Sequence, residues 1–289
     1  TRLQRRDWIS LLQFGVLSLV IMPILPNEEF GTFGALNPRQ IWWMVVLISG
    51  VSLAGYAALR IVGQRHGALL LGILGGLASS TATTLVYSRH ASESEKLQPL
   101  SLVVILTANL VVLFRLAIVT AILQPAILQH LLPVLGSGAL AGLVFVAFAW
   151  QRMSNGGELP QLELRNPTEL ATALTFGAVY AGVLLLSAAL SEKAGSLGLY
   201  AVALVSGLTD VDAITLSSLR LFGQEKLAAT AATTAILLAV LANLCFKFGI
   251  VVSVAGRALA MRVLGGFTAF AAGCIGGWLR TESSTEVCL

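Results

Sequence analysis

Nine mostly apolar stretches follow one another along this chain and are joined by short connections. Each is long enough to cross a bilayer, because a transmembrane helix needs about 20 mostly apolar residues. Inside lipid every backbone polar group must be paired, which limits spanning elements to helices and closed barrels. We therefore expect an all-α polytopic membrane protein without a soluble domain. The stretches are residues 9–25, 40–62, 67–88, 99–123, 131–151, 168–190, 197–219, 227–252 and 258–279.

The composition supports this class and excludes others. Apolar residues make up 56% of the chain and charged residues 11%, and the mean hydropathy is +0.86. The net charge of +4 comes from Lys and Arg near the ends of the stretches, where they face lipid headgroups, so it does not indicate nucleic-acid binding. Cys245, Cys274 and Cys288 are scattered and the three histidines lie in or near loops, so no Cys/His metal cluster is expected. We expect no cofactor.

Three short motifs recur in the same order in the two halves of the chain, at offsets of 129, 131 and 134 residues. This spacing predicts a single transmembrane domain (1–289) with a leading helix and loop (1–36), repeat 1 (37–152) and repeat 2 (166–280). The missing Met suggests that the chain is a processed or truncated piece of a longer one. The motif pairs are Asn37-Pro38 with Asn166-Pro167, residues 76–84 with 207–215, and Ala108-Asn109-Leu110 with Ala242-Asn243-Leu244.

The second motif pair places polar residues deep in apolar stretches. Residues 76–84 read Gly-Leu-Ala-Ser-Ser-Thr-Ala-Thr-Thr, and residues 207–215 read Gly-Leu-Thr-Asp-Val-Asp-Ala-Ile-Thr, so they align without gaps. Polar groups at membrane depth are rare unless they line a site or a packing interface. A repeated polar motif of this kind predicts one binding site built from both repeats.

Each motif also contains the elements of a helix break. Gly75, Gly76 and Gly207 can bend or interrupt a helix, and Ser79 and Asp210 follow as good N-cap residues. A break leaves backbone groups unpaired, so it must face protein or a water-filled cavity. We predict a fresh helix N-terminus near the bilayer centre in each repeat.

Loop charges favour motif segments that enter and leave the membrane on the same side. With Arg115 and Lys247 set aside, 16 Lys and Arg remain, and nine full crossings place eight on each side. If segments 67–88 and 197–219 are re-entrant and the N-terminus lies inside, 11 of these Lys and Arg residues lie inside and 5 outside. This distribution agrees with the positive-inside rule. The repeats would then be inverted, a common plan of transporters. A kinked crossing helix also fits the sequence.

Asp210 and Asp212 are the only acidic residues deep inside the nine stretches, since Glu169 stands at the very start of the stretch 168–190. A carboxylate at the centre of a membrane helix costs about 2.5–3.5 kcal/mol on insertion scales, so two of them indicate use in a site. A structural cap or a fixed ion pair is the alternative. The hydroxyls can instead bond their own i−4 carbonyls, and the asparagines can join helices. The candidate ion ligands are Asp210, Asp212, Ser79, Ser80, Thr81, Thr83, Thr84, Thr215, Asn109 and Asn243, with the two aspartates as the metal ligands.

Two cations, Arg115 and Lys247, lie well inside apolar stretches, whereas Arg60 and Arg262 lie near the ends of theirs. We expect them to neutralise the aspartates in the resting protein. Lys247 paired with Asp210 or Asp212 would be an exchangeable counter-charge. The alternative for each is a snorkelling side chain or a fixed ion pair.

Carboxylate, hydroxyl and amide oxygens are hard ligands that suit Mg²⁺, other divalent cations, Na⁺ or a proton. We therefore expect a channel or transporter for a hard cation. Transport of an anion or a small organic solute at the helix N-termini is the alternative, and a regulatory membrane partner without transport is a third. An enzyme is not expected, because no His lies at membrane depth. A homodimer stays open, since small-residue faces such as Gly138 and Gly142 can pack within or between chains.

Residues 31–38, 46–52 and 75–83 resemble the DUF4010 membrane family. The resemblance covers nearly the whole chain, and its Ser-Ser-Thr-Ala-Thr run is fairly specific. Members are usually joined to an MgtC/SapB-type membrane domain, whose signature this sequence lacks. The resemblance implies an inner-membrane protein of bacteria or archaea, an MgtC-type domain as partner and a loose link to magnesium.

Overall fold

The computed structural model describes residues 5–30, 36–43, 45, 46, 49, 50, 53, 67–153 and 170–286. Among these residues the regular secondary structure is helical, and the β-type pairing is one isolated bridge between Phe30 and Leu36, which confirms the expected all-α fold. The predicted stretch 40–62 and the second Asn-Pro motif lie largely outside the described residues. The helices are α1 (Arg5–Gly15), a π-helical continuation (Val16–Ile21), α2 (Met22–Ile24), α4 (Ala68–Glu93), α5 (Gln98–Leu123), α6 (Leu128–Gln151), α7 (Leu170–Thr209), α8 (Val211–Gly223), α9 (Ala229–Ala255) and α10 (Arg257–Glu286).

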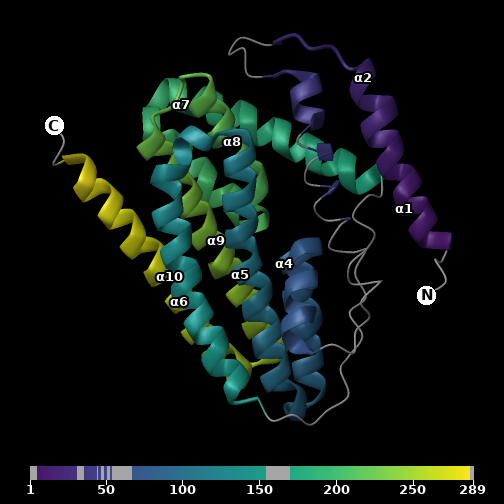
Figure 1. Cartoon of the computed structure of the whole chain (residues 1–289), viewed down its shortest axis with the longest axis vertical. Coiled ribbons are helices and arrows are strands. Elements are labelled where there is room, and N and C mark those ends of the chain that lie inside the picture. Colours follow the sequence, from purple (N-terminus) through teal and green to yellow (C-terminus); the bar gives the residue numbers. More distant parts are fainter. Residues whose placement is uncertain are drawn as a thin grey trace.

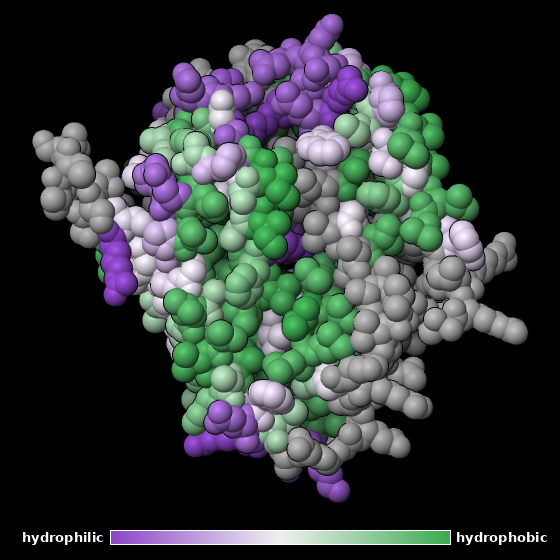
Figure 2. Space-filling model, viewed as in Figure 1, coloured by the Kyte–Doolittle hydropathy of each residue, from purple (hydrophilic) through white to green (hydrophobic). Residues whose placement is uncertain are grey.

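Five described helices are long and apolar enough to cross a membrane: Ala68–Glu93, Glu95–Leu123, Pro125–Gln151, Ala229–Ala255 and Arg257–Thr281. Three shorter apolar helices accompany them, at Leu11–Ile24, Tyr180–Leu190 and Lys193–Leu208. Figure 2 shows polar residues gathered at the two ends of the visible face and apolar residues between them. The protein is an integral membrane protein. The nine-segment repeat predicted from the sequence stays a prediction, because these spans do not establish it.

Helices α5, α6, α9 and α10 run side by side, with α4 beside the lower part of α5 in the view of Figure 1. Small residues allow the close contacts between α6 and α10. A β-carbon at Gly138 would collide with Cys274, and one at Gly142 would collide with the ring of Phe270. The helix face of Gly138 and Gly142, which the sequence allowed to pack within or between chains, thus packs within the chain.

Helix α4 turns back at its centre. Gly72 lies against Thr107 of α5, and Gly76 lies against Ala108, so the first half of α4 runs parallel to α5. The second half ends at Glu93, only a short turn before α5 begins, so it runs back toward the start of α5. Both ends of α4 therefore lie on one side of the bundle. Each half is about 16–21 Å long at 1.5 Å per residue, about half to two-thirds of a ~30 Å hydrocarbon core.

The second half of the chain contains a matching turn. Helix α7 is divided at Gly195 (φ 57°), and its second limb runs to Thr209 before α8 begins at Val211. The carbonyl of Gly207 in that limb accepts a hydrogen bond from Asn243 of α9. Helix carbonyls point toward the helix C-terminus, and a β-carbon at Gly207 would meet Ala239, so this limb runs parallel to α9.

Helix α8 then returns to the beginning of α9. It runs along α5 from the level of Arg115, which contacts Asp212, to that of Gln124, which lies against Gly223. Since α9 begins shortly after Gly223, the start of α9 lies near the end of α5. We call α4 and the segment from Gly195 to Gly223 the two re-entrant segments, because each turns back within the helix bundle. They enter the bundle from opposite sides.

Candidate functional site

The two re-entrant segments break at Ser79 and Asp210. Ser79 has extended backbone angles (φ −169°, ψ 105°) inside α4, and Asp210 has similar angles (φ −152°, ψ 128°) between α7 and α8. The Ser79 hydroxyl accepts a hydrogen bond from the Ala82 amide at 3.3 Å, and the Asp210 carboxylate accepts one from the Asp212 amide at 2.9 Å. These are N-cap interactions, so a new helix begins at each break where the sequence predicted one.

The glycines near the breaks have a different role from the one expected. Gly75, Gly76 and Gly207 keep helical backbone angles, and the extended residue lies three positions after Gly76 and Gly207. A β-carbon at Gly76 would lie 2.8 Å from the Cα of Ala108, and one at Gly207 would lie 2.6 Å from the Cα of Ala239. These glycines let each re-entrant limb touch the backbone of a long helix.

We predict that Gly207→Ala lowers the thermal unfolding midpoint of the detergent-solubilised protein. The added carbon meets backbone atoms of Ala239, and overpacking of this kind costs about 1–3 kcal/mol. Gly249→Ala in α9 is the matched control, because a β-carbon there meets nothing within 4 Å. A Gly207→Ala midpoint at or above that of the control would contradict the close packing.

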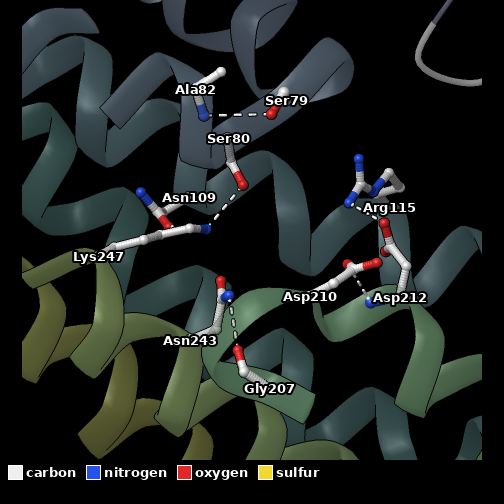
Figure 3. A network of polar contacts seen from close by, with 10 residues as sticks. All are labelled: Ser79, Ser80, Ala82, Asn109, Arg115, Gly207, Asp210, Asp212, Asn243 and Lys247. Atoms are coloured by element: carbon white, nitrogen blue, oxygen red, sulfur yellow. Dashed lines mark hydrogen bonds and ion pairs between the residues drawn. The ribbon is translucent and has the colours of Figure 1, made fainter. Parts of the chain in front are cut away.

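The two breaks meet at a polar cavity of about 240 Å³. The α4 break contributes hydroxyl groups and the α8 start contributes both carboxylates, while α5 and α9 each contribute a polar side chain. Figure 3 shows these residues converging from the four helices. The cavity is lined by Ala78, Ser79, Ser80, Thr81, Val112, Arg115, Asp210, Val211, Asp212 and Asn243.

Arg115 and Asp212 form a buried ion pair across the cavity wall. The Arg115 guanidinium donates to the Asp212 carboxylate over 2.6 Å, and the two side chains are 10% and 7% exposed. This pair joins α5 in the first half of the chain to α8 in the second. Asp210 differs, because no Lys or Arg of the described residues lies within ion-pair distance of its carboxylate.

Lys247 does not pair with either aspartate. Its ammonium group donates to the Ser80 hydroxyl and to the Asn109 side-chain carbonyl, each at 2.8 Å. It lies beside a much smaller pocket that also includes Asn109, Val112, Val211 and Asn243. The expected counter-charge is therefore supplied to Asp212 by Arg115, while Lys247 joins α9 of the second half to α4 and α5 of the first (Figure 3).

The third motif pair is displaced by one helical turn in the structure. Gly76 lies against Ala108 and Gly207 lies against Ala239, an offset of 131 residues on both helices. This offset matches Asn243 with Val112 rather than with Asn109. The two asparagines consequently do different work, since Asn243 caps the Gly207 carbonyl at 2.9 Å and Asn109 holds Lys247.

Four predicted ligands do not line the cavity. One of them is Asn109, which lines only the smaller pocket beside Lys247. The hydroxyls of Thr83 and Thr84 are buried and donate to the carbonyls of Ser79 and Ser80, four residues earlier. Thr215 is fully buried one turn beyond Asp212 in α8, and its hydroxyl has no hydrogen-bond partner among the described residues. Conversely, Ala78, Val112 and Val211 line the cavity without having been proposed. The 131-residue offset from Asn243 is the signal that would have indicated Val112.

The model of the family described as "Domain of unknown function (DUF4010)" matches residues 46–255, more than half of the chain. The chain belongs to the DUF4010 family. A relative from Aquifex aeolicus (strain VF5), named as an uncharacterized protein, is 32% identical over 182 residues, 63% of this chain and 79% of the relative. No solved structure matches.

Proposed function

We propose that this DUF4010 protein transports a hard cation through the cavity between Ser79 and Asp210. The observation that carries the proposal is the charge of the cavity wall. Asp210 and Asp212 contribute two carboxylates, and Arg115 balances only the second of them. An uncompensated carboxylate at membrane depth is expensive, and a bound cation would remove that cost.

The other lining groups suit the same substrate. Ser79, Ser80 and Thr81 bring hydroxyl oxygens and Asn243 brings an amide to the cavity. Hard cations prefer such oxygens, and Mg²⁺ usually keeps several waters when it binds. A cavity of about 240 Å³ holds a cation with part of its hydration shell, since water takes about 30 Å³ in the liquid.

The arrangement of the two halves supports alternating access rather than a fixed pore. Two re-entrant segments enter the bundle from opposite sides, and each packs on a long helix with an offset of 131 residues. Inverted repeats, as inferred from the sequence, would produce this arrangement. In such folds one repeat moves against the other around a site near the midplane. The contacts of Arg115 with Asp212 and of Lys247 with Ser80 would break and re-form during this motion. Each of them joins a long helix of one half of the chain to the re-entrant segment of the other half.

The test is flux of Mg²⁺, Ca²⁺, Mn²⁺, Na⁺ and H⁺ into liposomes that contain the purified protein. We expect one of these cations to move and Asp210→Asn to reduce that flux at least ~100-fold, about 2.7 kcal/mol of lost stabilisation. Glu95→Gln, in the exposed turn between α4 and α5, is the matched control and should leave flux unchanged. The proposal fails if no cation moves, or if Asp210→Asn transports as well as the control.

Transport of a small anion is the second candidate, and the two helix N-termini at the cavity favour it. Helix N-termini attract negative charge, and Arg115 lines the same space. Both termini are already capped by Ser79 and Asp210, which lowers their capacity for an anion. The same liposomes assayed with phosphate, sulfate and small carboxylates would identify this case.

The remaining expectations extend the proposal. We place the protein in the inner membrane of a bacterium or archaeon with an MgtC-type domain as a partner, as the family resemblance implies, and without an enzymatic reaction. A homodimer is an open alternative to a monomer.

A further inference from the structure

The ammonium group of Lys247 is held by neutral oxygens alone among the described contacts. Its Nζ atom donates to Ser80 Oγ and Asn109 Oδ1 at 2.8 Å each, and the residue is only 1% exposed. Lysine is almost never fully buried unless it is paired with an opposite charge. The groups available to stabilise a positive charge here are the hydroxyl of Ser80, the amide of Asn109 and the aspartates farther away.

Hydrogen bonds that do not involve Lys247 help to position these two oxygens. The amide nitrogen of Asn109 donates to the Ile105 carbonyl of its own helix at 2.8 Å, which turns Asn109 Oδ1 toward the ammonium group. Ser80 lies in the first turn after the α4 break, whose backbone is fixed by the Ser79 cap. The oxygen pair is thus a prebuilt ligand set for a small cation, and hydroxyl and carbonyl oxygens are hard ligands.

The oxygen pair adjoins the main cavity. The small pocket beside Lys247 shares Val112, Val211 and Asn243 with the 240 Å³ cavity, and Ser80 itself lines that cavity. An ion in the main cavity would therefore lie close to the ammonium group and repel it.

We propose that Ser80 Oγ and Asn109 Oδ1 form a second, monovalent cation subsite, and that the Lys247 ammonium occupies it as a tethered cation. Substrate in the main cavity and the tethered cation then compete, so Lys247 limits how tightly the substrate is held. A neutral residue in place of Lys247 leaves the subsite without its single positive charge. A bound Na⁺ would restore that charge without altering the net charge of the site. This inference rests on the proposed function for its consequence in transport, but the subsite is testable by binding alone.

The experiment is equilibrium binding of ²²Na⁺ to purified wild-type protein and Lys247→Met in detergent. We expect saturable binding of Na⁺ to Lys247→Met and at least about tenfold weaker binding to wild type. Lys247→Arg keeps a tethered charge and should bind as little Na⁺ as wild type. Lys247→Met/Asn109→Leu loses a ligand oxygen outside the main cavity and should lose the gained binding.

A stability measurement covers the case in which Lys247→Met folds poorly. A cation that binds only the folded state raises the unfolding midpoint, so NaCl should stabilise Lys247→Met, and its milder counterpart Lys247→Gln, more than choline chloride does. Lys247→Arg should show no such difference. Absence of both Na⁺ binding and Na⁺ stabilisation in these two neutral variants, or equal Na⁺ affinity in wild type, would overturn the subsite.

The two proposals fail in distinguishable ways. If wild type moves no cation in liposomes but Lys247→Met gains Na⁺ binding, the transport proposal is wrong and the subsite stands. If wild type transports and neither neutral variant gains Na⁺, the subsite is wrong and the main site stands.

Discussion

Replacing Arg115 with leucine should destabilise the protein by about 3–5 kcal/mol, because it leaves the buried Asp212 carboxylate without its ion-pair partner. Asp212 is only 5% exposed, so water replaces the guanidinium poorly. The start of α8 offers some compensation, since a helix N-terminus stabilises a nearby negative charge by about 0.3–2 kcal/mol. The thermal midpoint in detergent should fall accordingly.

The double variant Arg115→Leu/Asp212→Leu separates a lost ion pair from lost packing. With both charges removed, no uncompensated charge stays buried, so we expect the double variant to recover most of the stability while transport remains impaired. Arg152→Leu is a control for removal of a surface arginine, because Arg152 stacks on Phe148 at the end of α6. A single Arg115 variant as stable as the double one would show that the ion pair contributes nothing.

The sequence predicted those features of the site that depend on local chemistry. Extended N-cap positions at Ser79 and Asp210 follow from residue types that bond the backbone of the next turn, and this holds in any tertiary context. The all-α fold likewise follows from a local property, the length of the apolar stretches. Both are readable from a short window of residues.

Long-range partners were not readable in this way. Lys247 and Arg115 are separated from their partners by 97 to 167 positions, and the choice between Asp212 and Ser80 depends on how α5 and α9 cross. The asparagine match failed because similar Ala-Asn-Leu triplets lie one turn apart on the two long helices. Only the glycine contacts reveal the true offset.

Single cysteines in a background without Cys245, Cys274 and Cys288 should reveal the re-entrant topology as an all-or-none pattern. The second limb of α7 and the following α8 form one segment. If this segment enters and leaves the membrane on one side, cysteines that replace Lys193 and Glu225 react with a membrane-impermeant maleimide from the same face. A cysteine at Glu95 should react only from the opposite face, because α5 begins there and ends near α8.

The reference positions are Gln124, on the face expected for Lys193, and Arg257, on the face expected for Glu95. The argument depends on the direction of the helices, since the second limb of α7 runs parallel to α9 and α8 runs back. Labelling of Lys193 and Glu225 from opposite faces would mean that this segment crosses the membrane. The site would then lie in a kinked spanning helix, and the two halves would not be related by inversion.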